Sequence, residues 1–191
     1  MWQSMLIQHM LRNPWLSEAF CRSRNAPLAV IEQLGPATNR TSIGRDELVK
    51  IAQTKIAGAG GTERIKTLIE ENTEAEIRQA SAQAFATISP EEAVRILTTL
   101  KGVGVPVASA VLAWCFPKRW AVIDRRSWNA LASYGLLPSV RESQTTEEKI
   151  RDYGKYMEEV WRICDATGWQ PQRVDRWLYA FDKCEVTPAN L

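Results

Sequence analysis

Hydrophobic side chains recur every three or four positions along most of this chain, the spacing that places them on one face of an α-helix. Residues 46–57 carry such a stripe, residues 62–69 carry another, and a longer one runs from Ile150 to Cys164. No segment has the strict alternation of apolar and polar positions that indicates a half-buried strand. The pattern therefore predicts an all-α protein of about ten helices, most of them short.

Helix boundaries are marked by side chains that can satisfy free backbone groups. A Ser or Thr followed three residues later by Glu predicts a capping box at a helix start. Gly168 predicts the end of the long helix, and Gly58–Gly61 predicts a flexible link. The capping pairs are Thr73 with Glu76, Ser89 with Glu92, and Thr145 with Glu148. Further helices are expected over residues 1–12, 15–25 and 27–34, with a last one through Phe181.

A tight glycine turn interrupts two apolar helices near the middle of the chain. Lys101-Gly102-Val103-Gly104 follows a helix that begins at Pro90, and Pro106 lies near the start of the next helix. Free N–H groups at such a turn, together with a helix N-terminus, form a site suited to one phosphate. Lys101 adds a positive charge at its rim. An ordinary turn between helices is the alternative interpretation.

Asp124 follows the short apolar run Trp120–Ile123 and precedes a helix that extends toward Gly135. Asp is among the best N-cap residues, so a purely structural role explains it. A capping carboxylate is also held ionised by the helix dipole, which suits a group that stabilises positive charge. The two interpretations are compatible.

Composition limits the classes of function. The chain has 191 residues and a net charge of +2, enough for one domain or two small lobes. Residues 101–126 hold five basic side chains and one acidic side chain, and such a local basic face fits contact with the phosphates of a nucleic acid. A solvated basic loop is the alternative.

The four cysteines lack C-x-x-C spacing and His9 is the only histidine, so we expect no metal and no cofactor. No signal peptide or apolar run of membrane-spanning length is present, and reduced cysteines are expected. We therefore predict a cytoplasmic protein that does not bind membranes.

The turn and the aspartate together carry a family resemblance. Leu100, Gly102, Val103 and Gly104, followed by a helix, an apolar run and Asp124, resemble the signature of the helix-hairpin-helix DNA glycosylase superfamily. The match covers about thirty residues of 191. Members with lyase activity have a lysine where Pro106 stands here, so we expect no lyase activity. Many members have a small residue and a histidine after the aspartate, where this chain has Arg125 and Arg126.

The resemblance implies a two-lobed, all-α fold within a single domain, with a cleft between the lobes. Residues 45–135 would form the lobe that bears the hairpin, and residues 1–44 with 136–191 the other. It implies a monomeric, monofunctional DNA N-glycosylase that flips a damaged or modified base out of duplex DNA. Asp124 would stabilise the oxocarbenium ion and activate water. The DNA-binding residues would be Lys101, Gly102, Val103, Gly104, Val105, Arg125 and Arg126.

Three tryptophans near this stretch, Trp114, Trp120 and Trp128, are candidates for a base pocket, with core packing as the alternative. The substrate stays open between a repair lesion and a modified base of foreign DNA. A non-catalytic helix-hairpin-helix module that binds DNA is the competing function, and a helical protein-interaction domain is a third.

Overall fold

The structure, a computed structural model, describes residues 2–17, 40–57, 61–139 and 145–183. Within these ranges the regular structure is entirely helical, which confirms the predicted all-α class. None of the described helices is both long enough and apolar enough to span a membrane. The helices are α1 (Trp2–Arg12), α4 (Arg45–Ile56), α5 (Thr62–Glu70), α6 (Glu74–Ala86), α7 (Pro90–Leu97), α8 (Val105–Cys115), α9 (Arg125–Ser133), α10 (Thr146–Thr167) and α11 (Pro171–Lys183).

Side-chain caps set most of these boundaries. Thr73 and Thr145 form the predicted capping boxes of α6 and α10 with the glutamates three residues on. Gly168 ends α10 in the left-handed region, with φ of 70°. The predicted box at α7 forms only by half, because Ser89 accepts from the Glu92 N–H while the Glu92 carboxylate pairs with Arg95.

Some predicted segments cannot be compared with the structure. The helix predicted over residues 15–25 is described only as far as residue 17, and the helix predicted over residues 27–34 lies wholly outside the described residues. Residues 58–60 of the predicted flexible link also lie outside the described residues, as do residues 140–144 and 184–191.

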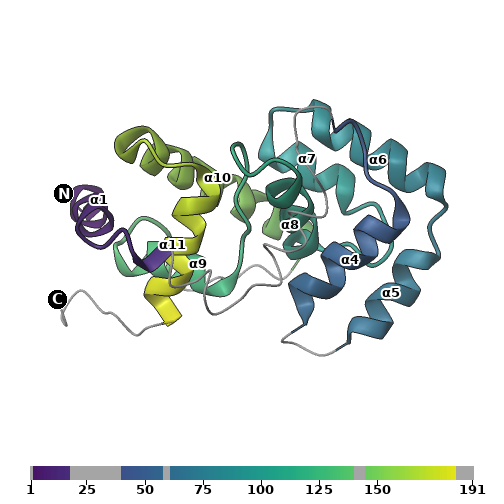
Figure 1. Cartoon of the computed structure of the whole chain (residues 1–191), viewed down its shortest axis with the longest axis horizontal. Helices are drawn as coiled ribbons and strands as arrows, with labels where there is room; N and C mark the ends of the chain where they lie inside the picture. The colour runs from purple at the N-terminus through teal and green to yellow at the C-terminus, as the bar shows by residue number, and fades with distance from the viewer. Residues whose placement is uncertain (1, 18–39, 58–60, 140–144, 184–191) are drawn as a thin grey trace.

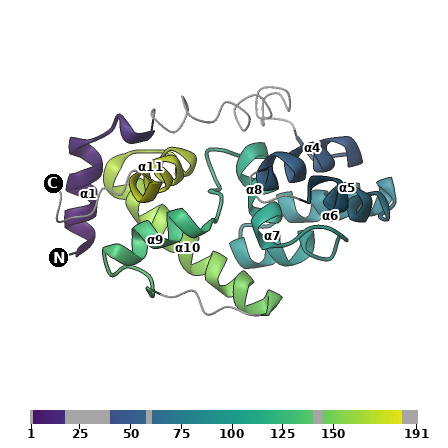
Figure 2. The same ribbon diagram turned by 90° about the horizontal axis from the view of Figure 1, so that it is seen from below.

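The helices gather at two ends of an elongated molecule (Figure 1). Helices α4 to α8 lie at one end, while α1, α9 and α11 lie at the other, and Figure 2 shows the same grouping from below. The long helix α10 runs between the groups and packs against α7, α8, α11 and α1. The described helices share one apolar core, in which Trp120 and Trp177 are both fully buried.

Candidate active site

The connection between α7 and α8 needs glycine at its tightest point. Gly102 has φ of +80°, a conformation that is costly for residues with a side chain. A Cβ atom there would lie 3.0 Å from Cγ1 of Ile69 and 3.2 Å from the carbonyl oxygen of Ile65. Helix α5 therefore packs directly against the backbone of the turn.

Asn72, between α5 and α6, is hydrogen-bonded to the backbone of Lys101, the first residue of this turn. Its Oδ1 accepts a hydrogen bond from the Lys101 N–H (2.9 Å), and its Nδ2 donates to the Lys101 carbonyl (3.1 Å). The same Nδ2 donates to the Ile69 carbonyl at 2.9 Å. The side chain is buried, so loss of this amide would leave polar groups of the turn without partners.

The turn leaves backbone N–H groups free next to the start of α8. Val103 N–H donates to the Leu100 carbonyl. Among the described residues, the N–H groups of Gly102, Gly104 and Val105 have no acceptor. Such groups at a helix N-terminus attract an anion.

Lys101 is already paired with a neighbouring carboxylate. Its ammonium lies 2.9 Å from the Glu71 carboxylate, and this pairing raises the pKa of Lys101. The lysine side chain is 60% exposed, and exposed ion pairs contribute little free energy. A phosphate group can therefore compete with Glu71 for Lys101.

Asp124 caps α9, as its position predicted. Its Oδ1 accepts hydrogen bonds from the N–H groups of Arg126 (2.8 Å) and Ser127 (3.0 Å). Its Oδ2 lies 3.8 Å from the ammonium of Lys55, near the end of α4. The Asp124 side chain is 26% exposed, so the carboxylate is anchored and still reaches solvent.

The apolar run before Asp124 ties it to the helix that follows the glycine turn. The Ile123 N–H donates to the Ser109 hydroxyl of α8 at 3.2 Å. Ser109 lies five residues after Gly104, a rise of about 7.5 Å along the helix axis. On the other side, the Tyr153 hydroxyl of α10 donates to the Ala121 carbonyl. The chain just before Asp124 is thus fixed next to the first turns of α8.

A buried carboxylate lies behind Asp124. The Ser127 hydroxyl donates to Asp175 Oδ1 at 2.7 Å, and the Tyr156 hydroxyl donates to the same oxygen at 2.9 Å. Burial and the nearby negative charge of Asp124 together raise the pKa of Asp175 to about 7, although Ser127, Lys55 and Tyr156 lower it. Asp175 therefore changes its charge near neutral pH.

The two arginines after Asp124 point to different partners. Arg125 is exposed. Arg126 binds the Asp182 carboxylate at 3.1 Å and lies over the Tyr179 ring, both on α11. Of these two predicted DNA-binding residues, Arg125 is the more open to a phosphate.

The three tryptophans proposed for a base pocket are buried, with 5% or less of each exposed. Trp128 Nε1 donates to the Pro138 carbonyl. The Trp120 ring contacts the Arg119 guanidinium and the Trp161 ring, and its Nε1 has no partner among the described residues. Their burial matches the core-packing alternative in this conformation, because stacking on a base requires an exposed ring.

Two residues at the site were not predicted. Lys55 comes from α4, and a lysine near a helix end is too common to be a signal. Asp175 had a signal, since it lies on the apolar face of α11 that also carries Val174 and Leu178. A carboxylate among buried positions indicates a hydrogen-bonded or functional group.

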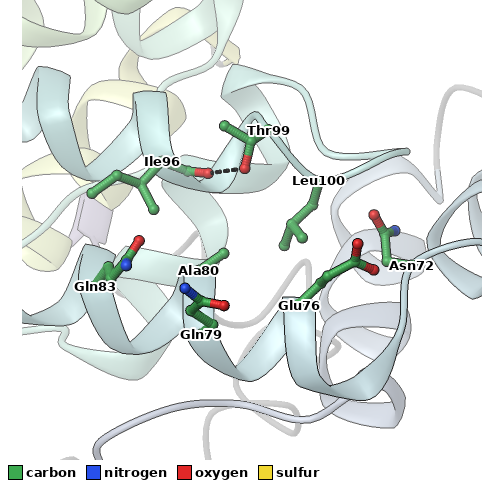
Figure 3. A pocket seen from close by; sticks show the side chains of 8 residues that line it. All are labelled: Asn72, Glu76, Gln79, Ala80, Gln83, Ile96, Thr99 and Leu100. Atoms are coloured by element: carbon green, nitrogen blue, oxygen red, sulfur yellow. Dashed lines mark hydrogen bonds between the residues drawn. The ribbon is translucent and has the colours of Figure 1, made fainter.

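A hollow of about 300 Å³ lies between α6 and α7. Figure 3 shows polar side chains of α6 on one side of it and Ile96, Thr99 and Leu100 on the other. Asn72 and Leu100 connect it to the glycine turn, whereas Asp124 does not line it. Its lining residues are Asn72, Glu76, Gln79, Ala80, Gln83, Ile96, Thr99 and Leu100.

Comparisons of the chain with models of known protein families, with curated proteins and with solved structures found no match.

Proposed function

We propose that this protein is a monofunctional DNA N-glycosylase that removes a damaged or modified base by hydrolysis. Residues 45–135 would form one lobe and residues 1–44 with 136–191 the other, with duplex DNA bound across a cleft between them. The observation that carries the proposal is the position of Asp124. This residue caps α9 and has a partly exposed carboxylate. The preceding residue, Ile123, is hydrogen-bonded to Ser109 of α8, the helix that begins at the glycine turn.

The turn supports a contact with the DNA backbone. The free N–H groups of Gly102, Gly104 and Val105 can bind one phosphate, assisted by Lys101 and by the N-terminus of α8. Contacts of this kind position a protein on DNA without reading its sequence. Because Arg125 is exposed near Asp124, it can bind a neighbouring phosphate.

Asp124 has the chemistry that base release requires. Cleavage of an N-glycosidic bond develops positive charge on the sugar, and a fixed carboxylate stabilises that charge most in the transition state. The same carboxylate can orient or deprotonate the attacking water. Its two backbone hydrogen bonds hold it in place before substrate arrives. No cofactor enters this mechanism.

The first test measures base release. Purified full-length chain is incubated with duplexes that each carry a different modified base, and alkali-labile sites are scored. Asp124→Asn should lower the release rate by on the order of 100-fold or more while DNA binding persists. Asp165→Asn, at an exposed position of α10, serves as the control. Full turnover by Asp124→Asn would remove this carboxylate from the reaction.

A second test addresses lyase activity. Pro106 occupies the position where lyase members of the resembled family have lysine, while Lys55 brings an amine to 3.8 Å from Asp124. The Lys55 side chain is 14% exposed and engaged with that carboxylate, so we expect hydrolysis alone. Borohydride should trap no covalent protein–DNA adduct. An adduct that disappears in Lys55→Arg would contradict the monofunctional assignment.

A non-catalytic DNA-binding module is the second candidate. The Asp124 carboxylate already accepts two backbone hydrogen bonds and contacts Lys55 without any substrate, as a carboxylate with a purely structural role would. This alternative predicts salt-sensitive DNA binding with no base released from any duplex.

A further inference from the structure

Ser127 connects two carboxylates at this site. Its backbone N–H donates to Asp124, and its hydroxyl donates to Asp175. Asp175 comes from α11, 51 positions further along the chain than Asp124, and is almost completely buried. A buried carboxylate with donors from two helices restrains those helices relative to each other.

We infer that Asp175 is a positioning residue of this site, which fixes the first turn of α9 through Ser127 and places a second negative charge behind Asp124. The inference rests on the proposed glycosylase function, because the second charge affects the rate only if positive charge develops in front of Asp124.

The charges that face Asp175 come from three directions. Asp124 and Ser127 approach from the start of α9, Lys55 from α4, and Tyr153 and Tyr156 from α10. Burial raises the pKa of both tyrosines well above the usual value, so both stay protonated near neutral pH. Of Asp175 and the two tyrosines, Asp175 is the residue whose pKa lies near neutral.

Ionisation of Asp175 changes the charge of the site. While Asp175 is protonated, the positive charge of Lys55 balances the negative charge of Asp124. As pH rises through about 7, Asp175 loses its proton and the group becomes net negative. A net negative site stabilises an oxocarbenium ion more strongly, so base release should accelerate over this range.

The kinetic test compares wild type with Asp175→Asn on the duplex of the panel that wild type processes fastest. The ratio of their base-release rates should be near one at pH 5 and about tenfold at pH 8, an interaction of one pK unit. Glu159→Gln is the matched control, because Glu159 is also buried but pairs with Arg162 on its own helix. A ratio that is the same at every pH would overturn the inference.

The second measurement needs no substrate. The side-chain carboxyl carbon of Asp175 is titrated by NMR in the wild type and in Asp124→Asn. The midpoint should lie near 7 in the wild type and move to lower pH in the variant, because a like charge has been removed. An unchanged midpoint overturns the inference. If wild type releases no base from any duplex, the proposed function fails, and this titration alone decides whether the two carboxylates are coupled.

Ser127→Ala covers the case in which Asp175→Asn does not fold. It removes the hydroxyl between the helices and keeps both carboxylates. Base release should fall several-fold while its rise with pH persists. An unchanged rate in a folded Ser127→Ala would contradict the positioning role.

Discussion

At the scale of single residues, the site depends on how buried and exposed charges are partnered. Asp124 accepts hydrogen bonds from two backbone N–H groups and reaches solvent. Asp175 accepts hydrogen bonds from the hydroxyl groups of Ser127 and Tyr156, and burial disfavours its charged form. Ser127 therefore links an aspartate that reaches solvent to one that is buried.

The burial of Asp175 predicts how stability depends on pH. An unfolded Asp has a pKa of about 4, whereas burial raises the pKa of Asp175 to about 7 in the folded chain. The folded state therefore binds more protons between these values, and the stabilisation present below pH 4 is lost as pH rises to 7.

Urea unfolding at pH 5 and pH 8 checks this sign. Between these values the wild type should lose on the order of 2 kcal/mol more of its unfolding free energy than Asp175→Asn. Parallel changes in the two proteins would show that Asp175 is already ionised at pH 5.

At the scale of elements, the α7–α8 turn is shaped by its neighbour α5. A Cβ atom at Gly102 would lie 3.0 Å from the Ile69 side chain and 3.2 Å from the Ile65 carbonyl oxygen, so α5 would have to shift to admit a side chain. The Asn72 side chain, which follows α5, forms hydrogen bonds with the N–H and the carbonyl group of Lys101. The phosphate-binding geometry that we propose is thus supported by residues outside the two helices that it joins.

A comparison of Gly102→Ala with Gly135→Ala separates the cost of backbone strain at positive φ from the cost of steric crowding by neighbouring atoms. Both glycines have positive φ, but a Cβ at Gly135 meets no atom within 4 Å. Gly135→Ala should cost about 1 kcal/mol of unfolding free energy from backbone strain, and Gly102→Ala about 2–4 kcal/mol because overpacking adds to it. Chemical denaturation of both variants measures the difference. Equal costs would mean that α5 yields easily at the turn.

At the scale of the whole molecule, the arrangement of charge governs the proposed DNA contact. The basic residues of 101–126 differ in exposure: the Arg126 side chain, paired with Asp182, is 37% exposed, whereas the Lys101 side chain is 60% exposed beside Glu71. Exposure, more than the sum of charges, decides which of them can neutralise a phosphate.

The salt dependence of DNA binding tests this contact. Lys101→Ala and Arg125→Ala should each reduce the slope of log K against log salt concentration by about one. Lys155→Ala, on the exposed face of α10, should leave the slope unchanged. Fluorescence anisotropy with a labelled duplex at several salt concentrations gives the slopes. Equal slopes for all three variants would place the DNA elsewhere on the molecule.

Features that depend on residues close together in the chain could be predicted from the sequence. The helices, the capping boxes of α6 and α10, the N-cap role of Asp124 and the glycine turn all follow from residues within a few positions of each other. Such interactions are local, and their signals are therefore visible in the order of residues. The DNA glycosylase function and its two lobes stay predictions.

Contacts between residues far apart in the chain could not be predicted from the sequence, because they depend on how the helices pack. Lys55 of α4 forms an ion pair with Asp124 at the start of α9. Asp175 of α11 accepts a hydrogen bond from Ser127, and Asn72 accepts one from the Lys101 N–H. No local pattern encodes these contacts, because they arise where packed helices bring side chains together. Packing also placed Trp114, Trp120 and Trp128 in the core, since burial of large aromatic surface contributes to stability.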